Sequence, residues 1–253
     1  MGMIRSLIVA FATYSRVPMP QVAWSEENRR YAMCFFPLVG AVTGAALWLW
    51  LWLCDALGFG ALLKGAVGAA IPLLVTGGIH MDGFMDTVDA LASCQPRERK
   101  LEILKDSHVG AFAAMACCGY MLVMAGLLGE ARAGDGPSVG LCFVLSRALS
   151  AWAMAAFQSA RPDGMLDSFA RAAQRRLVTA SSGIYAALCI LAWAFLNGWT
   201  ALICAVVAMT CLCCYRRVAY RQFGGVTGDL AGWFLQVTEL ALIAAVILGG
   251  RLL

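Results

Sequence analysis

The sequence predicts an all-α protein that crosses a membrane as a bundle of about seven helices. First, 61% of the 253 residues are hydrophobic and only 13% are charged, whereas a soluble domain carries about 25% charged residues. Second, the apolar residues gather in runs of about 20, the length of helix that crosses the hydrocarbon core. Third, the segments between these runs carry their basic residues unevenly. Helices are expected because backbone groups in lipid must form hydrogen bonds within their own segment.

Seven apolar segments fit this template. The expected spans are Tyr31–Cys54, Ala61–Ile79, Ala111–Leu128, Ser138–Ala160, Ser182–Asn197, Trp199–Tyr215 and Leu230–Gly249. The fifth and sixth are the shortest, and only Asn197-Gly198 separates them. A further apolar run, Ser6–Thr13, has no small-residue cleavage site after it, so we expect a retained, membrane-adjacent segment rather than a signal peptide.

The basic residues predict the orientation. With a cytoplasmic N-terminus and seven spans, the inside segments hold most of the 19 Lys and Arg residues. The outside segments hold only Lys64, Arg132 and Arg251, and Arg147 lies within a span. This asymmetry is the one that the positive-inside rule describes, so we expect the N-terminus in the cytoplasm.

A single integral membrane domain is expected over residues 1–253, because no repeat, linker or change of composition divides the chain. Its longest polar stretch, 80–110, is expected to be a cytoplasmic loop that holds helices of its own. A net charge of +4 without a basic tract argues against a nucleic-acid partner. The 11 cysteines lie almost all in apolar segments, where free cysteine acts as a small apolar residue, so no metal centre is expected at them.

The segment after the second span concentrates carboxylates. Asp82, Asp86 and Asp89 are spaced i, i+4 and i+7, so on a helix they share one face, and His80 precedes them. Carboxylates this close repel one another when ionised. A divalent cation removes the repulsion, and oxygen ligands favour Mg²⁺ over Zn²⁺. The alternative is a solvated acidic helix face, but the position at the end of an apolar span favours a metal site.

Two further features of the sequence are the glycines beside this cluster and a charged residue within an apolar span. Gly77, Gly78 and Gly83 allow close approach of a ligand or of a neighbouring helix, although small-residue helix packing is an alternative. Arg147 lies within an apolar span, where a cation costs several kcal/mol unless it is paired. It is expected either to contact substrate or to pair with Glu239, the carboxylate that lies well inside another span.

The chain resembles the cobalamin synthase family in six motifs that occur in the family's order. The most specific is Thr76-Gly77-Gly78-x-His80-x-Asp82-Gly83-x-x-Asp86-x-x-Asp89. The others are Ser15-Arg16-Val17-Pro18, Phe36-Pro37-Leu38-Val39-Gly40 with Gly44, Lys105-Asp106-Ser107 with Gly110-Ala111-Phe112, Ser146-Arg147, and Gly224-Gly225-x-Thr227-Gly228-Asp229 with Glu239. These matches cover nearly the whole chain and are too many, in too consistent an order, to arise by chance.

The resemblance implies an activity late in vitamin B12 assembly. Members join adenosylcobinamide-GDP to α-ribazole or its 5′-phosphate, release GMP, and form adenosylcobalamin or its 5′-phosphate with Mg²⁺. It also implies a multi-pass protein of the bacterial inner membrane whose active site faces the cytoplasm. The expected partners are these two substrates and the lipid bilayer, with a homo-oligomer or other corrinoid-pathway enzymes left open.

The resemblance also implies roles for individual residues. Asp82, Asp86 and Asp89 are expected to hold Mg²⁺, with Asp106 and Asp229 as ligands of a second ion or its waters. The expected base is His80 or Asp89, and Lys105 is a candidate phosphate clamp. The candidate substrate-binding residues are Arg16, Gly77, Gly78, Gly83, Ser107, Arg147, Arg161, Gly225, Thr227, Gly228 and Glu239.

Several of these residues have simpler interpretations. Lys105 could be an ordinary inside-loop charge, and Arg16 and Arg161 could be positive-inside anchors. Thr227 or Asp229 could cap the helix of the seventh span.

Three rival functions are open at this point. A transporter would usually show duplicated halves and midplane charges, and a CDP-alcohol phosphotransferase would carry Asp-x-x-Asp-Gly-x-x-Ala-Arg followed by Gly-x-x-x-Asp-x-x-x-Asp. In this chain no repeat is visible, the acidic residues cluster at one interface, and the CDP-alcohol motif is absent. A structural scaffold would not need three crowded aspartates.

Overall fold

A computed structural model describes residues 2–160 and 175–252 as an almost entirely helical chain. Within these ranges the only extended pairing is one isolated parallel bridge between Ser159 and Val226. The helices are α1 (Gly2–Tyr14), α2 (Glu26–Arg29), α3 (Ala32–Leu57), α4 (Ala61–Thr76), α5 (Ile79–Ala92), α6 (Arg97–Ile103), α7 (Ala111–Glu130), α8 (Gly136–Ala156), α10 (Arg175–Leu196), α11 (Gly198–Val218) and α12 (Gly228–Leu252).

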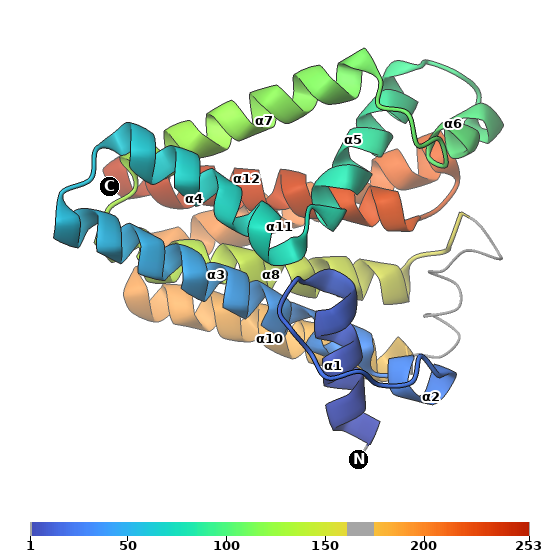
Figure 1. Ribbon diagram of the computed structural model, residues 1–253, viewed down its shortest axis with the longest axis horizontal. Coiled ribbons are helices and arrows are strands. Elements are labelled where there is room, and N and C mark those ends of the chain that lie inside the picture. The colour runs from blue at the N-terminus through green and yellow to red at the C-terminus, as the bar shows by residue number, and fades with distance from the viewer. Residues whose placement is uncertain (1, 161–174, 253) are drawn as a thin grey trace.

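The long helices run roughly side by side along the longest axis of the molecule (Figure 1). Six stretches of helix in the described chain are long and apolar enough to cross a membrane, and the bent pair α4–α5 is a seventh candidate. The predicted all-α membrane bundle is therefore confirmed. Helices α8 and α12 are the most buried: α8 packs against α3 and α10, and α12 packs against α5, α8 and α11.

Small residues bring α3 and α8 into close contact. A side chain added at Gly44 would lie 2.5 Å from the carbonyl oxygen of Gly140, and one at Gly40 would collide with the backbone of Phe143. In a membrane, where lipid tails are as apolar as leucine, such close backbone approach is a main source of helix association.

The second predicted span ends earlier than expected. Helix α4 stops at Thr76, and α5 begins at Ile79 at an angle of 99° to it. Gly77 and Gly78 make the bend with φ values of 69° and 81°, a left-handed conformation that glycine adopts without the steric penalty of a Cβ atom. Apolar composition continued through Ile79, so hydropathy alone placed the boundary too late.

Other boundaries differ because helices extend beyond their apolar cores. Helix α10 begins at Arg175 rather than Ser182, and α11 continues to Val218 and into a π-helical turn, Ala219–Phe223. Asn197 separates the two helices as predicted, and its side chain accepts hydrogen bonds from the first backbone N–H groups of α11.

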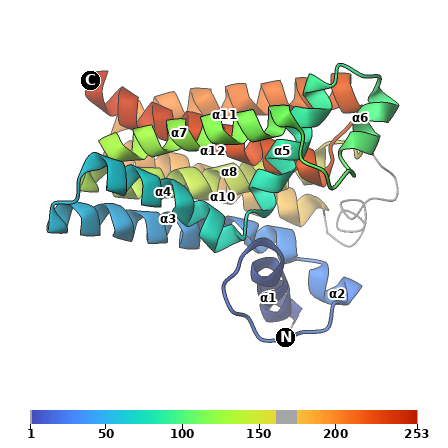
Figure 2. The ribbon, with the colours of Figure 1, turned by 45° about the horizontal axis from the view of Figure 1, so that its top comes forward.

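Helix α1 lies across the bundle rather than along it (Figure 2). Its second half is buried against α3, whereas Met3 and Ile4 in its first turn are exposed. Its C-terminal residue, Tyr14, lies beside His80 in the first turn of α5.

Candidate functional site

The first cavity lies where α5, α8 and α12 meet the end of α1. Its volume is about 310 Å³. It is lined by Thr13, Tyr14, Phe36, Ile79, His80, Asp82, Gly83, Ser150, Met154, Ser159, Val226, Thr227, Gly228, Asp229, Ala231 and Gly232. The cavity thus unites residues from three of the six sequence motifs.

Carboxylates from two helices meet at one part of this cavity. Asp82 comes from the first turn of α5, and Asp229 comes from the first turn of α12. The backbones of the two helices lie close together. A side chain added at Gly83 would lie 2.8 Å from the carbonyl oxygen of Asp229, and one added at Gly232 would lie 2.9 Å from that of His80. Of the two partners considered for Gly83, a ligand or a neighbouring helix, the structure places the neighbouring helix α12 against it.

Aromatic rings form another part of the same cavity. The ring centroid of His80 lies 6.2 Å from that of Tyr14 and 5.6 Å from that of Phe36, and the Tyr14 and Phe36 centroids are 4.5 Å apart. His80 is 5% exposed, and its buried Nε2 has no hydrogen-bond partner among the described residues. Burial, together with the Arg147 cation, lowers the pKa of His80 well below its ordinary value, so the ring is a neutral imidazole.

A second cavity, of about 340 Å³, lies beside α5 and the loop after α6. It is lined by Asp86, Asp89, Ser93, Ile103, Asp106, His108, Val109, Gly110 and Phe112. The sequence grouped Asp82, Asp86 and Asp89 on one helix face and set Asp229 apart. The structure divides that face between the two cavities and places Asp229 with Asp82.

Asp89 has a clear structural partner. Its two carboxylate oxygens accept hydrogen bonds from the backbone N–H groups of Gly110, at 2.6 Å, and Ala113, at 2.9 Å. These N–H groups belong to the beginning of α7, where backbone donors have no partner within the helix. Asp89 therefore ties α5 to the start of α7.

The carboxylates affect one another's protonation. Helix α5 carries three aspartates and lies outside the six long apolar helices. Burial and the nearby charges of Asp82, Asp229 and Asp89 raise the pKa of Asp86 to about 6. At the second cavity, hydrogen bonds from the ring and backbone of His108 lower the pKa of Asp106.

The chemistry of these residues fits a divalent cation, although their present geometry does not form a ligand cage. Within the described chain, no three His, Cys, Asp or Glu side chains converge as metal ligands. The fit rests on the oxygen donors of α5 and α12, because burial and the nearby charges of Asp82, Asp229 and Asp89 raise the pKa of Asp86. Oxygen donors of this kind suit Mg²⁺ or Ca²⁺.

The chain reaches α12 through a tight turn. Val226 bridges to Ser159, and a side chain at Gly225 would collide with the backbone of residues 158–160. The Thr227 hydroxyl then accepts a hydrogen bond from the backbone N–H of Leu230 at 3.2 Å. Thr227 therefore caps α12, as the simpler interpretation proposed, while it also lines the first cavity with Gly228.

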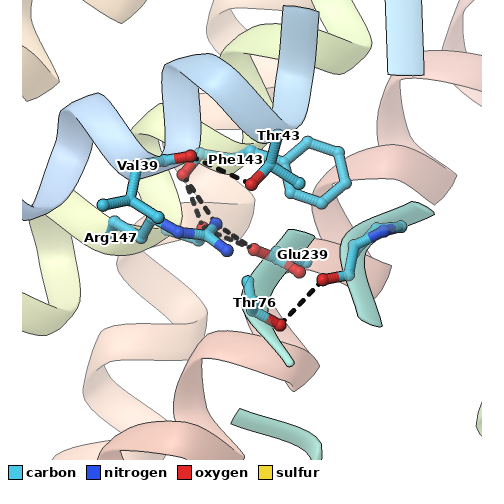
Figure 3. A network of polar contacts seen from close by, with 8 residues as sticks. Val39, Thr43, Thr76, Phe143, Arg147 and Glu239 are labelled. Atoms are coloured by element: carbon cyan, nitrogen blue, oxygen red, sulfur yellow. Dashed lines mark hydrogen bonds and ion pairs between the residues drawn. The ribbon is translucent and has the colours of Figure 1, made fainter. Parts of the chain in front are cut away.

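Arg147 and Glu239 form an ion pair inside the bundle (Figure 3). Each side chain is 1% exposed. The guanidinium also donates to the backbone carbonyl of Phe143 at 3.0 Å, and Ser146 donates to Glu239 at 3.2 Å. Neither charged residue lines either cavity. This arrangement matches the structural alternative, and the predicted substrate contacts of Arg147 and Glu239 have no support in it.

Arg16, Gly77 and Gly78 lie together at the bend between α4 and α5. The backbone N–H of Arg16 donates to Val75 at 2.7 Å, and the side chain of Arg16 covers Gly77. Lys105 and Ser107 are exposed on the loop that carries Asp106. Arg161 lies outside the described residues, so its predicted role has no structural counterpart.

Sequence reasoning missed several residues of this end of the bundle. Tyr14, Phe36 and Ser150 line the first cavity, and only Phe36 lay within a motif. Lys100 is buried and donates to the side chain of Gln222 at 2.6 Å, which docks α6 on the π-helical turn. Nothing in the local sequence signalled these contacts, because they join segments far apart in the chain.

Known proteins resemble this chain over nearly its full length. The family described as cobalamin-5-phosphate synthase matches residues 6–247. A Lachnoclostridium phytofermentans protein named adenosylcobinamide-GDP ribazoletransferase is 40% identical over 248 residues, covering 98% of this chain and 95% of that protein. Proteins of the same name from Desulfitobacterium hafniense and Brucella ovis are 34% and 32% identical, over 95% and 98% of this chain and 95% and 98% of their own. No solved structure matches the chain.

Proposed function

The chain belongs to the cobalamin-5-phosphate synthase family, and on that premise we propose that it is an adenosylcobinamide-GDP ribazoletransferase. It joins adenosylcobinamide-GDP to α-ribazole or its 5′-phosphate, releases GMP, and forms adenosylcobalamin or its 5′-phosphate. The observation that carries this proposal is the meeting of Asp82 and Asp229 in one cavity, where motifs about 150 residues apart in the chain converge.

The proposed site needs a cation because its carboxylates would otherwise repel the diphosphate of the substrate. Asp82, Asp86 and Asp229 would hold Mg²⁺, with Asp89 and Asp106 as neighbours at the second cavity. When bound, the ion stabilises the negative charge that builds on the leaving phosphate. The shared charge of these carboxylates supports this assignment.

The protein's own residues supply binding and proton transfer. A ribazole hydroxyl oxygen forms a new bond to the phosphorus attached to the corrinoid, and the bond from that phosphorus to the GMP oxygen breaks. The hydroxyl proton passes to a base within hydrogen-bond reach. His80 suits this role because its imidazole is neutral and its Nε2 is free of partners among the described residues. Asp89 suits it less, because both its oxygens already accept backbone hydrogen bonds.

The proposed location is the bacterial inner membrane, with the site facing the cytoplasm. The basic residues support this orientation, because the inside segments of the predicted topology hold most of them. The nucleotide-activated substrate would reach the site directly from that side. A homo-oligomer, or assembly with other enzymes of the corrinoid pathway, remains a prediction.

Purified protein tests the proposal directly. In detergent or nanodiscs, GMP should appear only when adenosylcobinamide-GDP, α-ribazole or its phosphate, and Mg²⁺ are all present. Chelation of the metal should abolish GMP release, and re-addition of Mg²⁺ should restore it. Substrate uptake into proteoliposomes without GMP release would instead favour the transporter.

A further inference from the structure

We propose that the aromatic part of the first cavity binds the dimethylbenzimidazole base of α-ribazole, while adenosylcobinamide-GDP reaches the carboxylates from outside it. The juxtaposition that carries this assignment is a cavity with Tyr14, Phe36 and His80 in one part of its wall, and with Asp82 and Asp229 in another. The inference rests on the proposed function, which supplies the identity of the two substrates.

The size of the cavity selects the smaller substrate. Small-molecule sites in proteins range from about 300 to 1,000 Å³, and this cavity, at about 310 Å³, lies at the lower limit. A nucleoside such as α-ribazole is of that size class. A complete corrinoid ring, with its adenosyl ligand and nucleotide, is several times larger. The corrinoid must therefore stay outside, and only part of its diphosphate arm could reach the carboxylates.

The chemistry of the wall selects between the two bases. The guanine of adenosylcobinamide-GDP carries several hydrogen-bonding groups on its edges, and each would need a partner once buried. Dimethylbenzimidazole presents methyl groups and an aromatic face. The lining of the cavity also includes the apolar side chains of Ile79 and Met154. Aromatic rings 4.5 to 6.2 Å apart provide stacking and edge contacts for a flat apolar base.

His80 links the aromatic and acidic parts of the cavity. Its buried Nε2 lacks a partner among the described residues, although the side chain lines the cavity. A buried nitrogen left unsatisfied costs free energy, and a hydroxyl of the bound ribose would satisfy it. Because His80, Asp82 and Asp229 line the same cavity, a nucleoside with its base among the rings would direct its sugar toward the carboxylates. That orientation presents the attacking hydroxyl to the diphosphate.

Paired phenylalanine variants test the assignment. Phe36→Leu removes a cavity ring, whereas Phe84→Leu, on α5, removes a buried ring that packs on Tyr120 at 5.5 Å and lines neither cavity. Phe36→Leu should raise KM for α-ribazole about tenfold, the loss of about 1.4 kcal/mol of aromatic contact. It should leave KM for adenosylcobinamide-GDP within about twofold. Phe84→Leu should change neither KM. A rise in KM for adenosylcobinamide-GDP alone would overturn the assignment.

Direct binding separates this inference from the proposed function. Calorimetry with α-ribazole alone should show binding to the wild-type protein that GMP does not displace and that Phe36→Leu weakens. Competition by GMP would assign the cavity to the guanosine instead. If Phe36→Leu fails to fold, Tyr14→Leu, at the end of α1, gives the same test. A protein that binds α-ribazole in this way but never releases GMP would refute the proposed function and leave the binding site intact.

Discussion

The two ends of the bundle arrange their aspartates differently. At the end opposite α5, Lys64 of α4 pairs with Asp55 of α3 at 3.4 Å, and Asp55 also accepts a hydrogen bond from the backbone N–H of Ala133 at 2.7 Å. Lys64 donates as well to the carbonyl oxygen of Ala131. Lys64 and Asp55 therefore link α3 and α4 to the segment that follows α7.

At the other end, carboxylates gather with one another instead. Asp82 and Asp229 share a cavity, Asp86 and Asp89 line the next, and the pKa of Asp86 is raised by its neighbours. The helix α5, which carries Asp82, Asp86 and Asp89, is separated from α4 by a bend at two glycines. Local pairing of charges satisfies a fold, whereas a bound cation would stabilise like charges that are crowded beside cavities. The comparison therefore supports the proposal that places the site at the end with α5.

The largest effect on stability is expected in the middle of the bundle, between these ends. Arg147→Met leaves Glu239 buried without its partner and should lower the free energy of unfolding by about 3–5 kcal/mol. Lys64→Met breaks a pair whose Asp55 is 40% exposed, and should cost about 1 kcal/mol or less. Denaturant unfolding in detergent, followed by tryptophan fluorescence, compares the two variants.

The double variant Arg147→Met with Glu239→Leu should recover most of that stability, because no buried charge is left alone. If this double variant is stable and keeps GMP release, neither residue binds substrate. Equal losses for Arg147→Met and Lys64→Met would contradict the difference in burial.

The second effect concerns activity. Asp82→Ala should reduce GMP release at least about a hundredfold, as expected when the metal site of a phosphoryl transfer is broken. Asp55→Ala, at the opposite end, removes an aspartate of the same size and should keep turnover within about threefold. Initial rates at saturating substrates measure both. Near-normal turnover of Asp82→Ala would remove this residue from the mechanism.

The third effect is a dependence on pH. The folded-state pKa of Asp86, about 6, lies above its ordinary value of 3.8, so the folded protein holds this proton more tightly than the unfolded chain does. In the metal-free protein, the resulting stability is present below about pH 4 and is lost as the pH rises to about 6. Mg²⁺ competes with the same proton, so its apparent affinity should fall up to about tenfold per pH unit below 6.

Thermal unfolding between pH 4 and pH 8, with and without Mg²⁺, measures both trends. Asp86→Asn is the matched variant, because it keeps the shape and removes the titrating group. It should be more stable than the wild type at pH 7 without metal and should respond less to Mg²⁺. A wild-type protein whose Mg²⁺ response is the same at pH 5 and pH 7.5 would contradict the role of Asp86.

The last expected effect concerns helix packing. Gly83→Ala places a methyl group against the backbone of Asp229 and should cost about 1–3 kcal/mol through overpacking. Gly119→Ala, on α7, meets no atom within 4 Å and should be neutral or stabilising by about 0.5–1 kcal/mol. Unfolding in detergent compares them. A stable Gly83→Ala protein would show that α5 and α12 can separate without cost.

The sequence by itself determined the helical membrane bundle, the number of apolar segments, and the residue types of the acidic motif. Hydropathy and residue spacing are local properties of the sequence, so they can be determined without knowledge of the fold. They could not place the end of α4, because the conformation of Gly77 and Gly78 decides it. They also could not place the extended ends of α10 and α11, which continue as helix beyond their apolar residues.

Only the tertiary structure decided which charged residues meet. It placed Asp229 in the same cavity as Asp82 and paired Arg147 with Glu239. It joined Asp89 to the beginning of α7 through hydrogen bonds. It also brought Tyr14 and Phe36 to His80. These contacts join helices far apart in the chain, and close packing at residues such as Gly83 sets their distances. Spacing along one helix carries no information about which neighbouring helix lies across from it.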